Sequence, residues 1–149
     1  MSYTYLKLLL GNVQALQLFE KTKDYTEGRE KSGSFFPGDV VEIPFPYTDL
    51  SGFKTRPALV LAKSKMDITV AFISTHISWI SYEDMYILPA KENGLSKISL
   101  LRAGKLFTLT PELVYRKIGT FSNFELQAAL WCVKACLSGM VWPEQKTGI

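Results

Sequence analysis

The sequence is poor in the residues that build metal sites and disulfide frameworks. Its 149 residues include two cysteines, Cys132 and Cys136, and one histidine, His76, with no Cys-x-x-Cys pair. Because structural zinc sites take about four closely spaced Cys or His ligands, neither a zinc site nor a disulfide framework is predicted. The two cysteines are four residues apart in a helical pattern, which predicts small packed side chains. We expect no metal and no other cofactor.

Long apolar runs are also missing. The stretch Leu8-Leu9-Leu10 is followed by Asn12, Gln14 and Gln17, which interrupt it. A membrane-spanning helix needs about 20 mainly apolar residues, and a signal peptide needs an uninterrupted apolar core. We therefore expect no membrane contact and a cytoplasmic protein.

Strong charge of either sign is absent too. The net charge is +3, with 47% hydrophobic and 13% aromatic residues. This composition is typical of a globular chain and argues against disorder. The mildly basic balance permits a nucleic-acid partner without requiring one.

The periodicity of apolar residues divides the chain into three parts. Residues 4–24 have the spacing of an amphipathic helix, and residues 24–34 have the polar, Gly- and Ser-containing composition of a linker. We therefore predict an N-terminal helical extension with its linker over 1–34, a compact domain over 35–138 and a loosely attached tail over 139–149.

The compact domain shows mostly strand signals followed by one helix. Short apolar or alternating runs predict strands over 40–45, 58–63, 69–74, 85–88, 99–102, 106–109 and 116–119. Pro44 and Pro46 should end the first strand or lie on an edge. Ser122 and Glu125 form a capping box, a stripe of Leu126, Leu130, Val133 and Leu137 follows, and Gly139 is the predicted stop. The fold class is mainly β with helices (α+β), a small barrel or rolled sheet packed on a C-terminal helix.

The segment 38–61 is the most informative part of the domain. It consists of two apolar strands joined by a polar loop, with Lys54 and Arg56 where the second strand begins. Functional residues are often carried on loops held by a rigid scaffold. A cationic pair at such a junction is suited to holding a phosphate.

Four blocks in this order resemble the MazF/PemK-type toxins of bacterial toxin–antitoxin systems. They are Gly-Asp-Val-Val with Pro-Phe-Pro-Tyr-Thr-Asp-Leu-Ser-Gly, then Arg-Pro-Ala-Leu-Val-Leu, Ile73-Ser74-Thr75, and Leu101-Arg102 with Lys105-Leu106-Phe107-Thr108. The resemblance covers residues 36–138 and implies an SH3-like barrel, a homodimer and inhibition by a cognate antitoxin. It also implies a metal-independent endoribonuclease that cleaves single-stranded RNA, with the 2′-hydroxyl attacking the adjacent phosphate.

The resemblance also implies which residues carry the chemistry. Arg56 matches the family's catalytic arginine, for which we favour charge stabilisation, and Ser74 matches its hydroxyl residue. Arg102 matches an arginine used in one branch of the family, and His76 is a candidate base because it shares a face with Ser74 if the strand persists. Predicted substrate-binding residues are Lys54, Thr55, Thr75, Phe53, Phe45 and Lys105.

One departure from the family pattern stands out. The carboxylate proposed as a base in the branch that uses Arg102 lies two residues further on, where this chain has Gly104. Asp49 could supply a carboxylate from the loop, although a turn residue is the commoner role for an aspartate there. Two alternatives therefore stay open: a non-catalytic barrel that binds RNA or an antitoxin, and a protein-interaction module.

Overall fold

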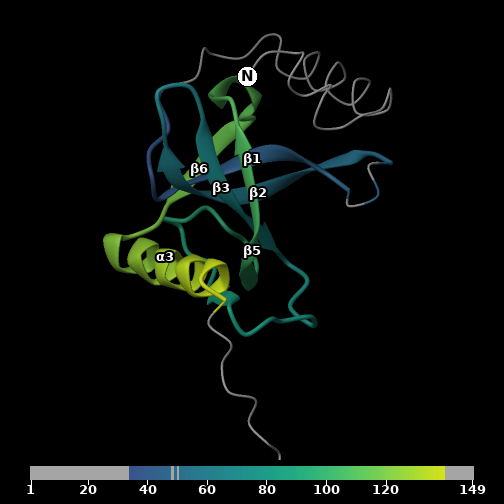
Figure 1. Ribbon diagram of the computed structural model, residues 1–149, viewed down its shortest axis with the longest axis vertical. Helices are drawn as coiled ribbons and strands as arrows, with labels where there is room; N and C mark the ends of the chain where they lie inside the picture. The colour runs from purple at the N-terminus through teal and green to yellow at the C-terminus, as the bar shows by residue number, and fades with distance from the viewer. Residues whose placement is uncertain (1–33, 48, 50, 140–149) are drawn as a thin grey trace, which may run out of the picture.

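The computed structural model describes residues 34–47, 49 and 51–139, which form one curled antiparallel sheet and one long helix (Figure 1). The strands run in the order β4-β5-β3-β2-β1-β6. Their bounds are β1 Asp39–Pro46, β2 Phe53–Lys63, β3 Ile68–Ser74, β4 Met85–Ile87, β5 Ser99–Leu109 and β6 Arg116–Thr120, with a 3-10 turn η1 at Pro111–Leu113 and helix α3 at Asn123–Leu137. The predicted α+β class is confirmed. The predicted N-terminal helix, linker and most of the tail lie outside the described residues.

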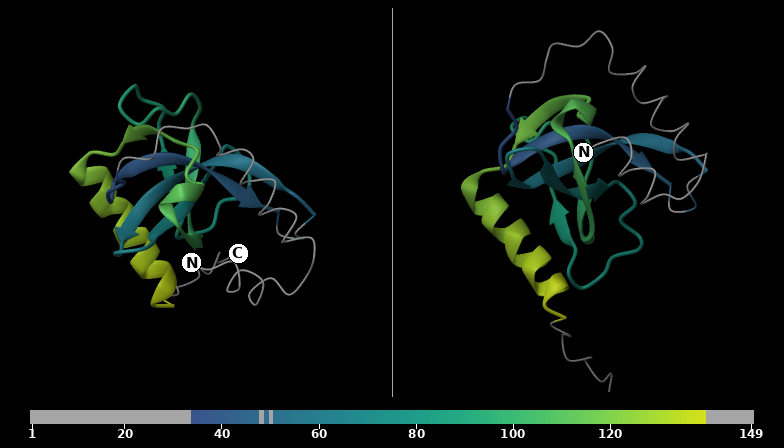
Figure 2. Two further views of the ribbon diagram at one scale, coloured as in Figure 1. Left: turned by 90° about the horizontal axis from the view of Figure 1, so that it is seen from above. Right: turned by 45° about the horizontal axis from the view of Figure 1, so that its top comes forward.

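Alternation along the strands divides the core into two apolar clusters. Val40, Leu59 and Ala71 point to one side of the sheet, where they pack with residues of α3 such as Ala129 and Val133. We call this side the helix face, and Figure 2 shows α3 lying along it. The alternate residues of the same strands form the second cluster, which includes Val41, Ile43, Ala58, Val60 and Val70.

Strand β5 differs from the sequence expectation. The predicted strands 99–102 and 106–109 are two parts of one continuous strand, β5. The pairing of β5 with β3 contains a register shift between these two parts. Phe72 pairs with Arg102, whereas the adjacent Ala71 pairs with Leu106. The residues at 103–105 have no counterpart on β3, which is the geometry of a β-bulge. A bulge changes the direction in which the following side chains point.

The prolines of β1 lie where the sequence placed them, on an edge. β6 pairs with β1 only over Asp39–Glu42, so β1 has a single neighbour beyond that point. The amide of Tyr47 donates to the carbonyl of Gly52, and therefore the backbone nitrogen of Pro44 points away from β2. The missing N–H of Pro44 removes no bond from the sheet.

Helix α3 begins and ends as predicted, with one error. The Ser122 hydroxyl accepts from the Glu125 amide at 3.2 Å, and the Glu125 carboxylate accepts from the Ser122 amide at 2.7 Å. Gly139 follows with a φ of +63°. The predicted apolar stripe is wrong at its last member, because the side chain of Leu137 is 69% exposed. No helix among the described residues is long and apolar enough to cross a membrane.

The two cysteines of α3 are packed, as predicted. Both thiols are free, and both side chains lie against the apolar cluster of the helix face. Burial raises the pKa of the Cys132 thiol, and the Asp84 carboxylate adds a smaller upward contribution. Cys132 therefore stays a neutral packing group.

Candidate functional site

Strand β2 presents its two cations on one side of the sheet. Lys54 and Arg56 alternate with Thr55, so they lie on the same face as Ala58, opposite the helix face. Their partners on β1 are Phe45 and Ile43. The same alternation directs Thr55 and Phe53, two predicted substrate-binding residues, to the other side of β2.

The Arg56 guanidinium lies over an aromatic ring rather than beside a carboxylate. Its Cζ atom is 4.9 Å from the centroid of the Phe72 ring, and Lys105 Nζ is 5.9 Å from the same centroid. Phe45 packs against Phe72 at 4.9 Å between ring centroids. We call the side of the sheet with Lys54, Arg56 and Lys105 around Phe72 the cationic face. Among the described residues, none of these three cations forms an ion pair, so their charge is available to an anion.

Ser74 lies on the cationic face at the end of β3. It is two residues beyond Phe72, which corresponds to about 7 Å along a strand. Its side chain is nearly buried, and its hydroxyl oxygen accepts a hydrogen bond from the His76 amide at 3.1 Å. No other described residue bonds this hydroxyl, so its proton and a second lone pair remain for another partner.

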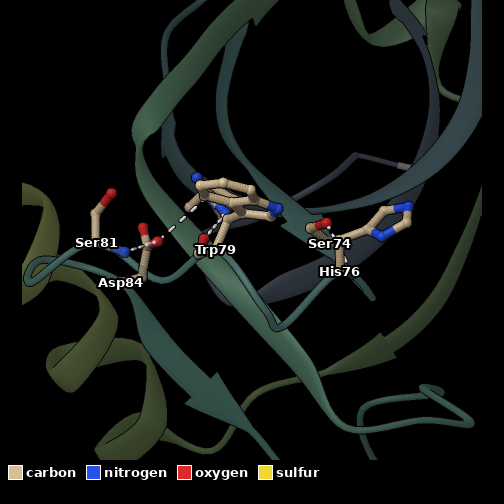
Figure 3. A network of polar contacts seen from close by, with 6 residues as sticks. Ser74, His76, Trp79, Ser81 and Asp84 are labelled. Atoms are coloured by element: carbon tan, nitrogen blue, oxygen red, sulfur yellow. Dashed lines mark hydrogen bonds and ion pairs between the residues drawn. The ribbon is translucent and has the colours of Figure 1, made fainter.

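The sequence argument for a shared face of Ser74 and His76 required the strand to continue to His76, and it does not. β3 ends at Ser74, and residue 75 lies in a bend. Thr75 and His76 are both exposed, and Figure 3 shows the imidazole of His76 on the side of Ser74 away from Trp79. A turn, not the two-residue strand period, therefore positions His76.

Arg102 is held by two partners from the loop between β3 and β4. Its Nη1 donates to the carbonyl of Trp79 at 2.6 Å, and its Nε lies 3.3 Å from Asp84 Oδ2. The side chain of Asp84 is 3% exposed and also accepts from the Ser81 amide at 2.9 Å (Figure 3). Arg102 pairs with Phe72 across β3 and β5, so its backbone lies next to the residue whose ring carries Arg56, while its guanidinium is directed toward Asp84.

Gly104 points away from the cationic face. A Cβ atom placed on it would lie 3.2 Å from Cys136 Sγ, on α3. In a regular strand, residues 102 and 104 would share a face and residues 102 and 105 would not. The bulge reverses this relation, because Lys105 reaches the Phe72 ring while residue 104 faces the helix.

Asp49, the loop residue that could supply a carboxylate, uses its side chain to close a turn. Its Oδ1 accepts from the Ser51 hydroxyl at 2.7 Å and from the Ser51 amide at 3.0 Å. These bonds hold the pKa of Asp49 below its usual value, and the bond from the Ser51 hydroxyl has the larger effect. Asp49 is thus an ionised, exposed turn residue.

Sequence reasoning missed the loop that holds Arg102. Trp79 and Tyr82 are 80% and 81% exposed, and Asp84 follows them directly before β4. The only signal was two large aromatic residues in a short segment between predicted strands. Nothing in the sequence paired Asp84 with Arg102.

Comparison with known proteins adds a family and a fold. The family model described as PemK-like, MazF-like toxin of type II toxin-antitoxin system matches residues 36–137. No curated protein sequence matches the chain.

Several solved structures have a similar fold. One is an endoribonuclease in complex with its cognate antitoxin from a mycobacterial species, with a TM-score of 0.56 and 15% identity over 74% of this chain and 100% of that one. A second mycobacterial endoribonuclease has a TM-score of 0.55 and 14% identity over 76% of this chain and 100% of that one. The Mycobacterium tuberculosis toxin MazF-mt6 has a TM-score of 0.51 and 19% identity over 68% of this chain and 99% of its own.

Proposed function

Because the chain belongs to the PemK-like, MazF-like toxins of type II toxin–antitoxin systems, we propose that it is an endoribonuclease that cleaves single-stranded RNA. The single observation that carries this proposal is the Arg56 guanidinium, which lies over Phe72 on the face that ends at Ser74 and has no ion-pair partner within residues 34–47, 49 and 51–139. A fork of N–H donors that stays cationic at working pH is suited to the oxygens of a phosphate. The nearby Lys105 adds a second positive charge.

The reaction that fits these groups uses the RNA as its own nucleophile. The 2′-oxygen forms a bond to phosphorus and the bond from phosphorus to the 5′-oxygen breaks, leaving a 2′,3′-cyclic phosphate and a 5′-hydroxyl. The proton of the 2′-hydroxyl goes to a base, and the leaving oxygen receives a proton. Arg56 stabilises the charge that develops on the phosphate oxygens. Ser74 orients the 2′-hydroxyl or binds a phosphate oxygen through its free O–H donor.

Further parts of the proposal concern partners. The mycobacterial neighbour in complex with its cognate antitoxin supports an antitoxin that neutralises this chain as well. We also propose a homodimer acting on RNA in the cytoplasm, with residues 35–138 as the catalytic domain. Exposed Thr75 and Lys105 extend the RNA-binding surface from the cationic face.

A cleavage assay in excess EDTA tests the function. Purified protein should cut single-stranded RNA to 2′,3′-cyclic phosphate ends, and should fail to cut a matched oligonucleotide with a 2′-deoxyribose at the cleaved position. Arg56→Ala, purified identically, controls for a contaminating ribonuclease. Absence of cleavage across varied RNA sequences, with RNA binding retained, would overturn the enzymatic proposal and favour a non-catalytic RNA-binding barrel. Absence of binding as well would favour a protein-interaction module.

A further inference from the structure

The carboxylate of Asp84 is buried at the start of β4. It is 3% exposed, and its Oδ2 atom serves both the Ser81 amide, at 2.9 Å, and Arg102 Nε, at 3.3 Å. Its own amide donates to the carbonyl of Ser81 at 3.0 Å, which closes a tight turn. A buried carboxylate needs charged and hydrogen-bonding partners, and here both come from the site region.

Arg102 connects this turn to the cationic face. Its guanidinium spans from Asp84 to the Trp79 carbonyl, while its backbone pairs with Phe72, over which Arg56 lies. A guanidinium has five N–H donors in a rigid fork, and these contacts engage the Nε and Nη1 groups. No described residue bonds the Nη2 group, which leaves it to an anion at the site. Its direction is fixed by the two contacts already made.

The loop from residue 75 to residue 84 is held by the same contacts. It leaves β3 directly after Ser74, whose hydroxyl binds the His76 amide, and it returns to β4 through Asp84. Its middle is attached through the Trp79 carbonyl to Arg102. Removal of the Asp84 charge would therefore free the Arg102 guanidinium and, through its bond to the Trp79 carbonyl, loosen the loop that leaves Ser74 (Figure 3).

We propose that Asp84 is a positioning residue for RNA cleavage, acting through Arg102: it fixes the direction of the guanidinium on the strand that pairs with Phe72 and, through the bond of Arg102 to the Trp79 carbonyl, holds the loop 75–84. The proposal rests on the ribonuclease function proposed above. Asp84 is not the base, because a carboxylate that is 3% exposed and bonded to Arg102 is shielded from a 2′-hydroxyl. It also supplies a carboxylate partner for Arg102 from the loop before β4, which Gly104 on β5 cannot do.

Asp84→Asn tests this in single-turnover cleavage of one RNA oligonucleotide at saturating protein. The amide keeps the size of the side chain and removes its charge. Since misplacement of a reacting group by about 1 Å can slow a reaction about a hundredfold, we expect a rate lower by about tenfold to a hundredfold, with RNA affinity changed less than about threefold. Glu83→Gln removes the same charge one residue away and should leave the rate unchanged.

A double-mutant cycle separates positioning from mere destabilisation. If Asp84 acts through Arg102, Asp84→Asn should slow an Arg102→Ala background by less than about twofold, because the partner is already gone. Equal losses in both backgrounds would overturn the proposal, as would an unchanged rate in Asp84→Asn. Asp84→Glu, which keeps the charge on a longer arm, serves if the asparagine variant does not fold, and the same loss and the same cycle are expected of it.

The wild-type protein distinguishes the two proposals. Cleavage by wild type together with an unaffected Asp84→Asn variant overturns the positioning role alone. If the wild type fails to cleave, the ribonuclease function and the positioning role fall together.

Discussion

Arg56 and Arg116 lie on opposite faces of the sheet and have different partners. On the cationic face, Arg56 lies over the Phe72 ring and forms no ion pair with any residue that the structure describes. Arg116 lies on β6, where it pairs with Glu42 of β1 on the face opposite Arg56. It donates to both carboxylate oxygens of Glu42, at 2.6 and 3.3 Å. The hydrogen bond and the charge of Glu42 raise the pKa of Arg116. The comparison teaches that the guanidinium of Arg116 is already engaged by a carboxylate, whereas that of Arg56 is left to an anion. Arg102 lies between the two cases, because its Nε and Nη1 groups are engaged by Asp84 and the Trp79 carbonyl.

The largest expected effect distinguishes these two arginines directly. Arg56→Ala should slow RNA cleavage by about a hundredfold to a thousandfold, the range found when one donor to a developing oxyanion is removed. Arg116→Ala should leave cleavage unchanged. Initial rates on one oligonucleotide in EDTA measure both. Similar losses in the two variants would contradict the assignment of chemistry to the cationic face.

A second comparison concerns hydroxyl groups on the two faces of β3. Ser74→Ala should slow cleavage by about tenfold to a hundredfold, because a hydrogen bond to a charged group contributes about 1.5–3 kcal/mol. Thr69, which alternates to the helix face, bonds Thr108 at 2.9 Å between hydroxyl oxygens. Thr69→Ala is therefore the matched control and should cleave normally. A normal rate in Ser74→Ala would remove Ser74 from the mechanism.

A third prediction tests the direction of residue 104. Gly104→Asp should lower the free energy of unfolding by about 1–3 kcal/mol, since its side chain would press on Cys136. It should not increase cleavage per folded molecule. Denaturant titration and the RNA assay measure the two effects, and adding Cys136→Ala should restore part of the stability. Faster cleavage by Gly104→Asp would mean that residue 104 reaches the cationic face.

The smallest expected effect comes from a substitution at the start of α3, on the helix face. Ser122→Ala removes the hydroxyl half of the capping box and should lower the free energy of unfolding by about 1 kcal/mol. Cleavage by the folded protein should stay the same. Thermal melting with a parallel RNA assay checks both. A slower folded enzyme would show that the two faces are coupled through α3.

Much of the fold follows from the sequence because local signals are strong here. The capping box, the position of Pro44 on an edge and most strands lie where alternation, turn residues and proline chemistry predict them. The family blocks also led to Arg56, whose placement on the ring of Phe72 agrees with a role at a phosphate.

What the sequence could not supply is long-range or breaks a regular period. The contact of Asp84 with Arg102 joins a loop residue to a strand 18 residues further on, and no local pattern encodes such a pair. The bulge in β5 inverts the faces of Gly104 and Lys105, so counting by two from Arg102 gives the wrong answer. The exposure of Leu137 follows from where the helix leaves the sheet, which its periodicity does not contain.

The edges of the sheet have a consequence for how this protein meets other chains. β4 has three residues, β6 begins with Arg116 and Lys117, and Pro44 lies in the part of β1 that β6 leaves uncovered. Short, charged or proline-bearing edges discourage the addition of a foreign strand. Edge-to-edge aggregation is therefore opposed at each of these places. A partner that docks on these edges has to recognise side chains rather than extend the backbone ladder.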